Sequence, residues 1–279
     1  MSAQARRLVR ILLYAALTVP LMPVQALLLL TGSPLARRLP RLYHRCSVWL
    51  LGFRLSIVGT RSRVAPTLFV ANHVSFIDIE VLGAVIDGCF ISKAEVARWP
   101  FFGWLAKLQR TVFVDRRVRS TADQRDAIRE RLDQADNLIL FPEGTTGDGN
   151  RVLPFKSALF SVADYRGAHG PLLVQPVSIA YVRLDGMPLG RFYRPFFAWY
   201  GDMEFAPHLW TMLGLGTVAV EVRFHPMVTL TEFGSRKALA EHCYRQVAAA
   251  LASAVAGRPQ EWPAPLPAPI QAPAPAIAE

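Results

Sequence analysis

Cysteine is scarce in this chain of 279 residues, and the cysteines that occur are isolated. Cys46, Cys89 and Cys243 lie far apart, without the CxxC or cysteine–histidine spacing that is typical of a zinc site. An odd number of scattered cysteines argues against a disulfide framework. It indicates free thiols in a reducing compartment.

Acidic residues are absent from the first 77 positions. The first is Asp78, and ten arginines precede it. Over the whole chain 31 lysines and arginines face 21 acidic residues, so the net charge of +10 belongs entirely to this N-terminal quarter. Charged residues make up only 19% of the chain and apolar residues 52%, which excludes a disordered chain.

The arginine-rich quarter also lacks any nucleic-acid-binding motif, so we expect no nucleic acid partner. Its arginines flank an apolar stretch, residues 11–30, that is just long enough to cross a bilayer core. Pro20 and Pro23 are expected to break a helix there into two short pieces. Basic flanks on both sides favour the cytoplasmic face for both ends of the stretch.

We therefore predict that residues 1–50 form an N-terminal helical membrane anchor, either a hairpin or an interfacial segment. The protein would be monotopic or hairpin-anchored on the cytoplasmic face of the inner or plasma membrane. There its arginines would meet anionic membrane lipids. Two other interpretations stay open: a cleavable signal peptide ending near Val24-Gln25-Ala26, and a helix buried in a protein core.

From Arg54 onward, short β-rich runs alternate with helical stretches. This alternation indicates an α/β fold with a mostly parallel sheet flanked by helices, which we assign to one domain, residues 51–257. Strands are expected at 55–59, 67–72, 89–93, 111–115, 138–141, 172–181 and 218–224. Helices are expected at 76–86, 120–135, 156–165 and 237–255. Residues 258–279 contain seven prolines, mostly in Pro-Ala repeats, and are expected to form a disordered tail.

Several common catalytic signatures are missing. The sequence has no Walker A loop, no G-x-S-x-G and no H-E-x-x-H. Residues 214–219 match the dinucleotide-binding pattern G-x-G-x-x-A. A strand-like run follows these glycines where a dinucleotide site needs a helix, so we reject that interpretation.

The segment from Asn72 to Asp78 follows a strand-like apolar run directly and carries the clearest chemistry. Residues at the carboxyl ends of strands in α/β sheets face the ligand crevice, and a histidine there can act as a general base. On one helix, side chains five positions apart point about 140° away from each other. His73 and Asp78 can therefore pair only if His73 lies in the turn before the helix and Asp78 in the first helical turn. Ser75-x-x-Asp78 also resembles a helix-capping box, and one carboxylate can do both tasks.

Two further strand ends carry polar residues. Glu143 follows the run 138–141 and is placed to accept hydrogen bonds from substrate hydroxyls, while Gly144 allows a backbone N–H to approach a ligand closely. An ordinary turn is the alternative there. Arg116, and Lys93 on another strand, are suited to binding phosphate, although solvated surface charge is the commoner fate of such residues.

Taken in order, four segments resemble the motif blocks of the 1-acylglycerol-3-phosphate (lysophosphatidic acid) acyltransferase family. His73 through Asp78 is similar to its H-x4-D block, and residues 103–116 to its second block. Residues 141–145 (Phe-Pro-Glu-Gly-Thr) are similar to the third, and residues 174–177 (Val-Gln-Pro-Val) to the fourth. The family is membrane-bound, in agreement with the anchor predicted above.

The resemblance implies transfer of a fatty acyl group from a thioester, either acyl-CoA or acyl-carrier protein. The acceptor would be the free hydroxyl of 1-acylglycerol-3-phosphate, a lysophospholipid, and the product phosphatidic acid. His73, oriented by Asp78, would be the base of a direct transfer without an acyl-enzyme, and neither a metal nor an organic cofactor is implied. The remaining site residues would bind the acceptor: Lys93, Arg116, Glu143, Gly144 and Thr145.

One position departs from the family pattern. The third block often continues Glu-Gly-Thr-Arg, whereas Thr146 stands here in place of that arginine. If the arginine holds phosphate, its task is unfilled or passes to Arg151 or Lys156. A related branch of the family acylates lyso-ornithine lipid, whose head group bears no phosphate, and the segment after Thr146 is compatible with that branch.

Two other functions are weighed against acyl transfer to a lipid. A non-enzymatic membrane-surface binding protein on the same scaffold would not need His73 for turnover. A thioesterase would use the same base on water, but the cationic residues would then have no purpose.

Overall fold

A mixed nine-stranded sheet forms the centre of the chain in the computed structural model, which describes residues 2–114, 122–167 and 170–258. Strands β1, β10, β8, β2, β5, β3 and β4 lie side by side in that order. All neighbouring pairs along this order are parallel except β10 with β8. The prediction of an α/β fold with a mostly parallel sheet is confirmed. The main strands are β1 (Phe53–Val58), β2 (Thr67–Ala71), β3 (Cys89–Lys93), β4 (Val112–Val114), β5 (Leu138–Leu140), β8 (Leu173–Leu184) and β10 (Val218–Phe224).

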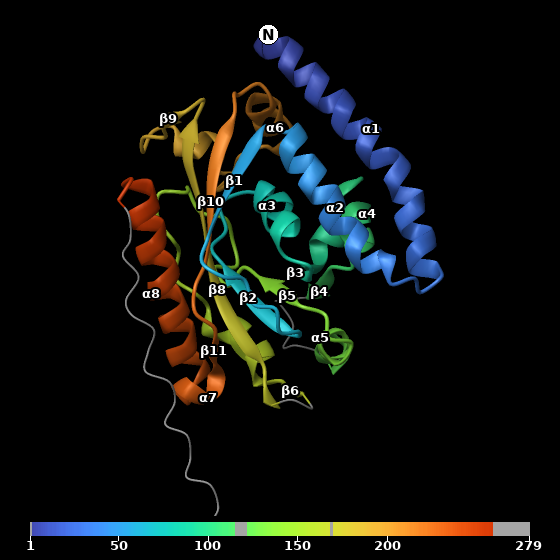
Figure 1. Cartoon of the computed structure of the whole chain (residues 1–279), viewed down its shortest axis with the longest axis vertical. Coiled ribbons are helices and arrows are strands. Elements are labelled where there is room, and N and C mark those ends of the chain that lie inside the picture. The colour runs from blue at the N-terminus through green and yellow to red at the C-terminus, as the bar shows by residue number, and fades with distance from the viewer. Residues whose placement is uncertain (1, 115–121, 168–169, 259–279) are drawn as a thin grey trace, which may run out of the picture.

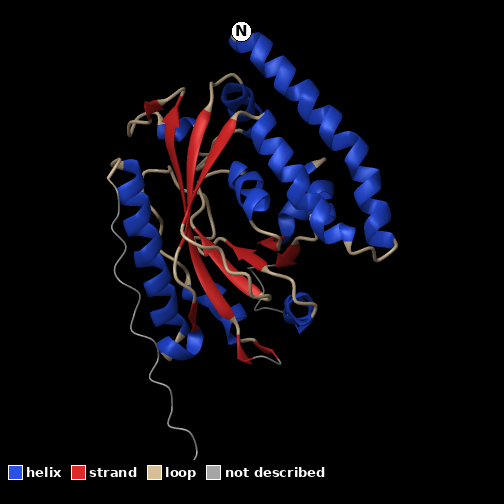
Figure 2. Ribbon diagram, in the orientation of Figure 1, coloured by secondary structure: helices blue, strands red, loops and turns tan. Residues whose placement is uncertain are grey.

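Helices cover both faces of this sheet (Figures 1 and 2). Helix α8 lies along one face, and α2 and α3 lie over the other. Successive residues of β2 point alternately into two cores: Leu68 and Val70 into one, and Phe69 and Ala71 into the other. Because both faces are buried, β2 is continuously apolar. The helices are α1 (Ala3–Leu30), α2 (Leu35–Leu50), α3 (Ile77–Val85), α4 (Phe102–Leu108), α5 (Ala122–Asp133), α6 (Phe205–Leu213), α7 (Leu230–Phe233) and α8 (Arg236–Val255).

The expected elements differ from the observed ones mainly where segments are short. Helices α4 and α6 and the two-residue strands β6 (Arg166–Gly167), β7 (Gly170–Pro171), β9 (Met187–Pro188) and β11 (Val228–Thr229) were not predicted. The helix expected at 156–165 is a 3₁₀ helix, Ser157–Asp164. Such short elements carry too few turns for a periodic pattern and are held by tertiary contacts. At residues 214–219, β10 follows the glycines as predicted, which agrees with rejecting a dinucleotide site.

Helix α1 corrects one expectation. It runs unbroken from Ala3 to Leu30 with Pro20 and Pro23 inside it, and α2 likewise contains Pro40. Each proline removes one backbone hydrogen bond. Side-chain bonds to the rest of the chain hold α1 on both sides of its prolines. Arg10 donates to the carbonyls of Leu213, Leu215 and Gly216 at 2.7–3.1 Å. Gln25 donates to those of Ala36 and Leu108 at 2.9 and 3.0 Å.

The burial of α1 is the reverse of that in a soluble helix. Its three buried residues, Arg10, Thr18 and Gln25, are all polar. Its apolar side chains are largely exposed, with Leu12 67% and Leu30 85% accessible. This is the one described helix that is long and apolar enough to cross a membrane, and little of it is buried. The alternative of a buried core helix is therefore wrong.

Candidate active site

His73 and Asp78 lie together at the carboxyl end of β2, in the positions that their spacing required. His73 follows the strand in a turn, and Asp78 is the second residue of α3. The histidine Nδ1 and the Asp78 Oδ2 are 2.9 Å apart. Asp78 is fully buried, whereas the His73 side chain is 19% exposed. Because Nδ1 bonds the carboxylate, Nε2 is the nitrogen left for a substrate, and it has no partner among the described residues.

The Asp78 carboxylate both caps the helix and orients the histidine. Its Oδ2 accepts the backbone N–H groups of Val74 and Ser75 at 2.6 and 2.9 Å. Its Oδ1 accepts the hydroxyl of Tyr181 at 2.8 Å. Tyr181 lies on β8 and was not identified from the sequence. Its burial, together with the neighbouring Asp78 charge, raises its pKa well above the ordinary value, so the hydroxyl stays protonated and acts as a donor.

The imidazole ring is also held from one side by aromatic stacking. The rings of His73 and Phe141 lie 4.0 Å apart, at an angle of 14°. Phe141 is in turn stacked with Phe90 of β3, with their ring centroids 6.2 Å apart. Stacking and the Asp78 bond together leave the ring a single orientation.

Glu143 is buried beneath the histidine and has partners inside the protein. One oxygen accepts the backbone N–H of His73 at 2.7 Å, and the other that of Leu153 at 2.9 Å. Each carboxylate oxygen thus has a backbone partner within the protein. Burial raises the pKa of Glu143 to about 8, while the two N–H donors oppose the shift. Glu143 therefore joins the turn of His73 to the loop that follows β5, and its contact with substrate remains a prediction.

The other predicted residues lie at the same edge of the sheet. Gly144 has a φ of 75°, a left-handed conformation that suits glycine, and Thr145 beside it is exposed. Lys93 is exposed at the end of β3, which pairs with β5. Arg116 lies outside the described residues.

Arg194 holds the loop that follows Thr146. Its guanidinium donates to the Asn150 side chain at 2.7 Å and to the carbonyls of Leu189 and Val255 at 3.0 Å. The Arg194 guanidinium therefore forms its hydrogen bonds within the protein and joins three segments of the chain. Arg151 and Lys156, the suggested substitutes for the missing family arginine, are both exposed.

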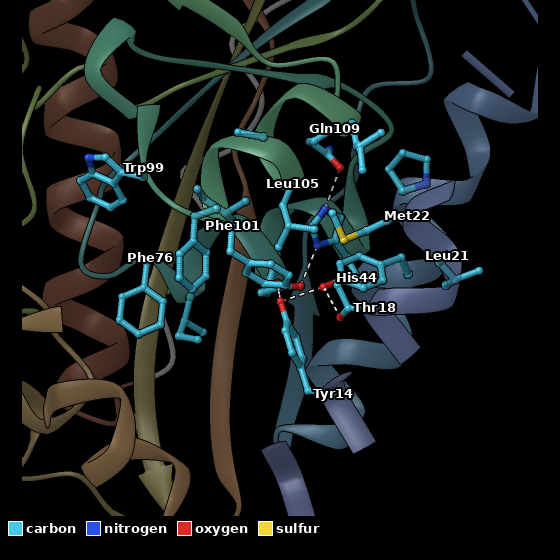
Figure 3. A pocket seen from close by; sticks show the side chains of 18 of the residues that line it. Tyr14, Thr18, Leu21, Met22, His44, Phe76, Trp99, Phe101, Leu105 and Gln109 are labelled. Atoms are coloured by element: carbon cyan, nitrogen blue, oxygen red, sulfur yellow. Dashed lines mark hydrogen bonds and ion pairs between the residues drawn. The ribbon is translucent and has the colours of Figure 1, made fainter. Parts of the chain in front are cut away.

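An apolar cavity of about 470 Å³ lies between α1, α2, α3 and α4. Phe76, three residues after His73, and Phe90, beside Phe141, line it. The cavity therefore comes close to the catalytic pair, although His73 and Asp78 are not among its lining residues. From there it extends to Leu21 and Met22 of α1 (Figure 3).

A network of polar side chains joins the helices on the far wall of this cavity. His44 lies 2.7 Å from Glu80 and 2.8 Å from Gln109, and Tyr14 donates to the other Glu80 oxygen at 3.0 Å (Figure 3). Burial lowers the pKa of His44, but Glu80 more than offsets this, so the net shift is upward. The Tyr43 hydroxyl donates to that of Tyr14 and lies 3.0 Å from that of Thr18, which extends the network along α1.

The comparisons with known proteins agree with this architecture. Residues 54–180 match a protein-family model described as Acyltransferase. The chain is 47% identical over 247 residues to a lyso-ornithine lipid O-acyltransferase of Brucella abortus, covering 87% of this chain and 92% of that protein. It is 32% identical over 186 residues to a 1-acyl-sn-glycerol-3-phosphate acyltransferase of Neisseria gonorrhoeae, covering 66% and 69%. The chain belongs to the 1-acylglycerol-3-phosphate acyltransferase family.

The crystal structure of another acyltransferase has the same fold. The 1-acyl-sn-glycerophosphate acyltransferase PlsC of Thermotoga maritima matches with a TM-score of 0.63 at 21% identity, over 93% of this chain and all of that one. The family assignment made from the four motif blocks is confirmed. The protein is an enzyme that transfers acyl groups to lysolipid-type acceptors.

Proposed function

We propose that this acyltransferase moves a fatty acyl group from an acyl thioester to the hydroxyl of lyso-ornithine lipid. The match to the Brucella abortus protein carries the proposal, because it is both more identical and longer than the match to the Neisseria gonorrhoeae enzyme. Thr146 supports it, since a head group without phosphate does not need the family arginine at that position.

Acyl transfer to 1-acylglycerol-3-phosphate is the second candidate. It is favoured by the relatives named for that reaction and by Lys93, an exposed cation at the edge of the sheet where His73 lies.

In either case we propose His73 as the general base. Its Nε2 takes the proton of the acceptor hydroxyl while that oxygen attacks the thioester carbonyl. The tetrahedral intermediate then releases the thiolate, which recovers the proton from His73. Asp78 keeps the proton on Nδ1 and stabilises the imidazolium, and the Tyr181 hydroxyl holds Asp78 in place. A positioned base of this kind contributes a factor of about 10²–10⁴ to the rate.

The cavity is the proposed site of an acyl chain. It is apolar, comes close to the catalytic pair and falls within the size range of ligand cavities, roughly 300–1,000 Å³. Acyl-CoA and acyl-carrier protein both deliver such a chain, and we propose one of them as the donor.

We also propose that α1 and α2 dock on the cytoplasmic leaflet. The exposed Leu35, Leu42 and Trp49 of α2 recur every seven residues and so share one face. Arg38 and Arg45 flank this face, where anionic head groups would contribute about 1 kcal/mol for each arginine. Apolar side chains outside and polar ones inside are what lipid requires of α1.

An acyl-transfer assay with detergent-purified protein tests the function. A radiolabelled thioester is offered with lyso-ornithine lipid or 1-acylglycerol-3-phosphate, for wild type, His73→Ala and the control His242→Ala on α8. We expect wild type and the control to acylate lyso-ornithine lipid, and His73→Ala to lose about 10²–10⁴-fold in rate. Product from the phosphate acceptor alone would establish the second candidate instead. Equal rates with His73→Ala would remove the histidine from the mechanism.

A further inference from the structure

A second cavity, of about 140 Å³, lies at the amino-terminal ends of the central strands, whereas His73 lies at their carboxyl ends. The residues that precede β3 and β5 line it, together with the first turns of α2. Because β2, β3 and β5 are parallel, their amino ends meet here and their carboxyl ends meet at the catalytic pair. A ligand in this cavity would not be the substrate of the acyl transfer proposed above.

Three arginines converge on one buried carboxylate in this cavity. Arg110 donates both terminal nitrogens to Asp136, Arg37 lies 3.6 Å from the same group and Arg131 3.9 Å from it. Asp136 is 6% exposed. One bidentate arginine already satisfies a carboxylate, so the charges of Arg37 and Arg131 remain in excess.

A second aspartate is shared in the same way. Arg41 lies 2.6 Å and Arg61 3.8 Å from the Asp87 carboxylate. The Nε of Arg41 is buried without a hydrogen-bond partner. Burial and the neighbouring charge of Arg41 both lower the pKa of Arg61. Among the described residues Asp87 and Asp136 are the acidic groups that line the cavity, and three arginines, Arg37, Arg41 and Arg110, line it with them. Arg61 and Arg131 approach the same two carboxylates from outside the lining and add to the excess of positive charge.

We propose that this cavity binds a phosphate group. A phosphate monoester dianion supplies negative charge that balances the excess positive charge of the arginines. Its oxygens accept hydrogen bonds from the paired N–H groups of guanidinium. The unused Nε of Arg41 would gain an acceptor, and a buried donor without one is costly. A lipid head group and free phosphate share this chemistry. Leu35 lies within one helical turn of Arg37 on α2, and its apolar side chain is exposed. An apolar surface beside the cavity favours a lipid, because the acyl chains of a lipid bind such a surface.

The proposed ligand would join the membrane helices to the sheet. Arg37 and Arg41 belong to α2, whereas Arg61 and Arg110 come from segments that border the sheet. A phosphate held by both groups therefore resists separation of α2 from the rest of the protein. Since it binds only the folded state, it also raises the unfolding temperature.

Calorimetric titration of the full chain in detergent tests the proposal. The probes are inorganic phosphate and short-chain dioctanoyl phosphatidic acid, and the variants are Arg41→Gln and the control Arg245→Gln, which makes the same charge change at an exposed position of α8, outside the cavity. We expect saturable binding by wild type and the control, and an affinity about tenfold lower for Arg41→Gln. The unfolding temperature rises with phosphate in wild type but not in Arg41→Gln.

The two probes separate the possible sources of the phosphate. Tighter binding of phosphatidic acid than of inorganic phosphate identifies a lipid head group, and equal binding identifies free phosphate. Absence of saturable binding of either probe overturns the proposal, as does an equal loss in Arg245→Gln, which would mean diffuse charge attraction. These outcomes do not depend on turnover, so they stand apart from the test of the proposed reaction.

Discussion

At the scale of single residues, the site depends on groups that pair across long stretches of chain. Tyr181 reaches Asp78 from 103 positions away, and nothing in its own segment distinguishes it from other strand residues. Glu143 was expected at the site. The two backbone N–H groups that donate hydrogen bonds to it were not predictable, because they belong to turns that the sheet brings together.

The raised pKa of Glu143 predicts a pH dependence of stability. The folded value of about 8 lies above the ordinary value of 4.5, so the folded state holds the proton more tightly than the unfolded state. The free energy of unfolding therefore falls as the pH rises between these two values. We expect Glu143→Gln to flatten this fall in thermal unfolding measured from pH 5 to 8.

The matched control is Glu241→Gln, an equal charge change on the exposed side of α8. It should keep the pH slope of wild type. An identical slope in Glu143→Gln would show that burial does not shift this carboxyl.

At the scale of elements, α1 is held to the domain by a few polar contacts placed along one side. Glycines before β1 and before β10 leave room for its arginines. A side chain in place of Gly52 would meet the Arg10 guanidinium at 2.1 Å, and one in place of Gly214 would meet that of Arg7 at 2.6 Å. In the G-x-G pattern at 214–216, which matches a nucleotide-binding motif, Gly214 thus makes room for Arg7 of α1, whereas a side chain in place of Gly216 would meet Asp185.

We predict that Arg10→Ala loosens α1. Three carbonyls, those of Leu213, Leu215 and Gly216, lose their donor, and a buried acceptor without a partner costs about 1–3 kcal/mol. Denaturant unfolding in detergent should show this loss of stability, and limited proteolysis should cut earlier within residues 31–34. Arg45→Ala, an exposed arginine of α2, is the control. Equal stability and cutting in the two variants would mean that Arg10 does not hold the helix.

At the scale of the whole molecule, exposed apolar and basic residues occur together on α1 and α2. Helix α2 lies beside α1 (Figure 1), and both helices carry exposed apolar side chains. The aromatic side chains that follow β9 divide between the surface and the core. Phe192 is 89% exposed, whereas Phe197 is 1% exposed in the core.

The proposed docking predicts that Leu42→Asp weakens binding to anionic vesicles. Burying a leucine contributes about 1.5–3 kcal/mol, so removing it should lower the partition coefficient about tenfold or more. Met187→Asp changes an exposed apolar residue of β9 and serves as the control. Vesicle co-sedimentation at low and high salt measures both variants. Equal binding by Leu42→Asp and wild type would remove α2 from the membrane contact.

The sequence by itself determined the family, the strand order along the chain, the apolar N-terminal segment and the pairing of His73 with Asp78. These depend on local spacing and periodicity, which a linear pattern contains. Only the tertiary structure decided the continuity of α1, the contact of Tyr181 with Asp78 and the two cavities. Each of these joins residues from distant segments, and their approach is set by the packing of helices against the sheet.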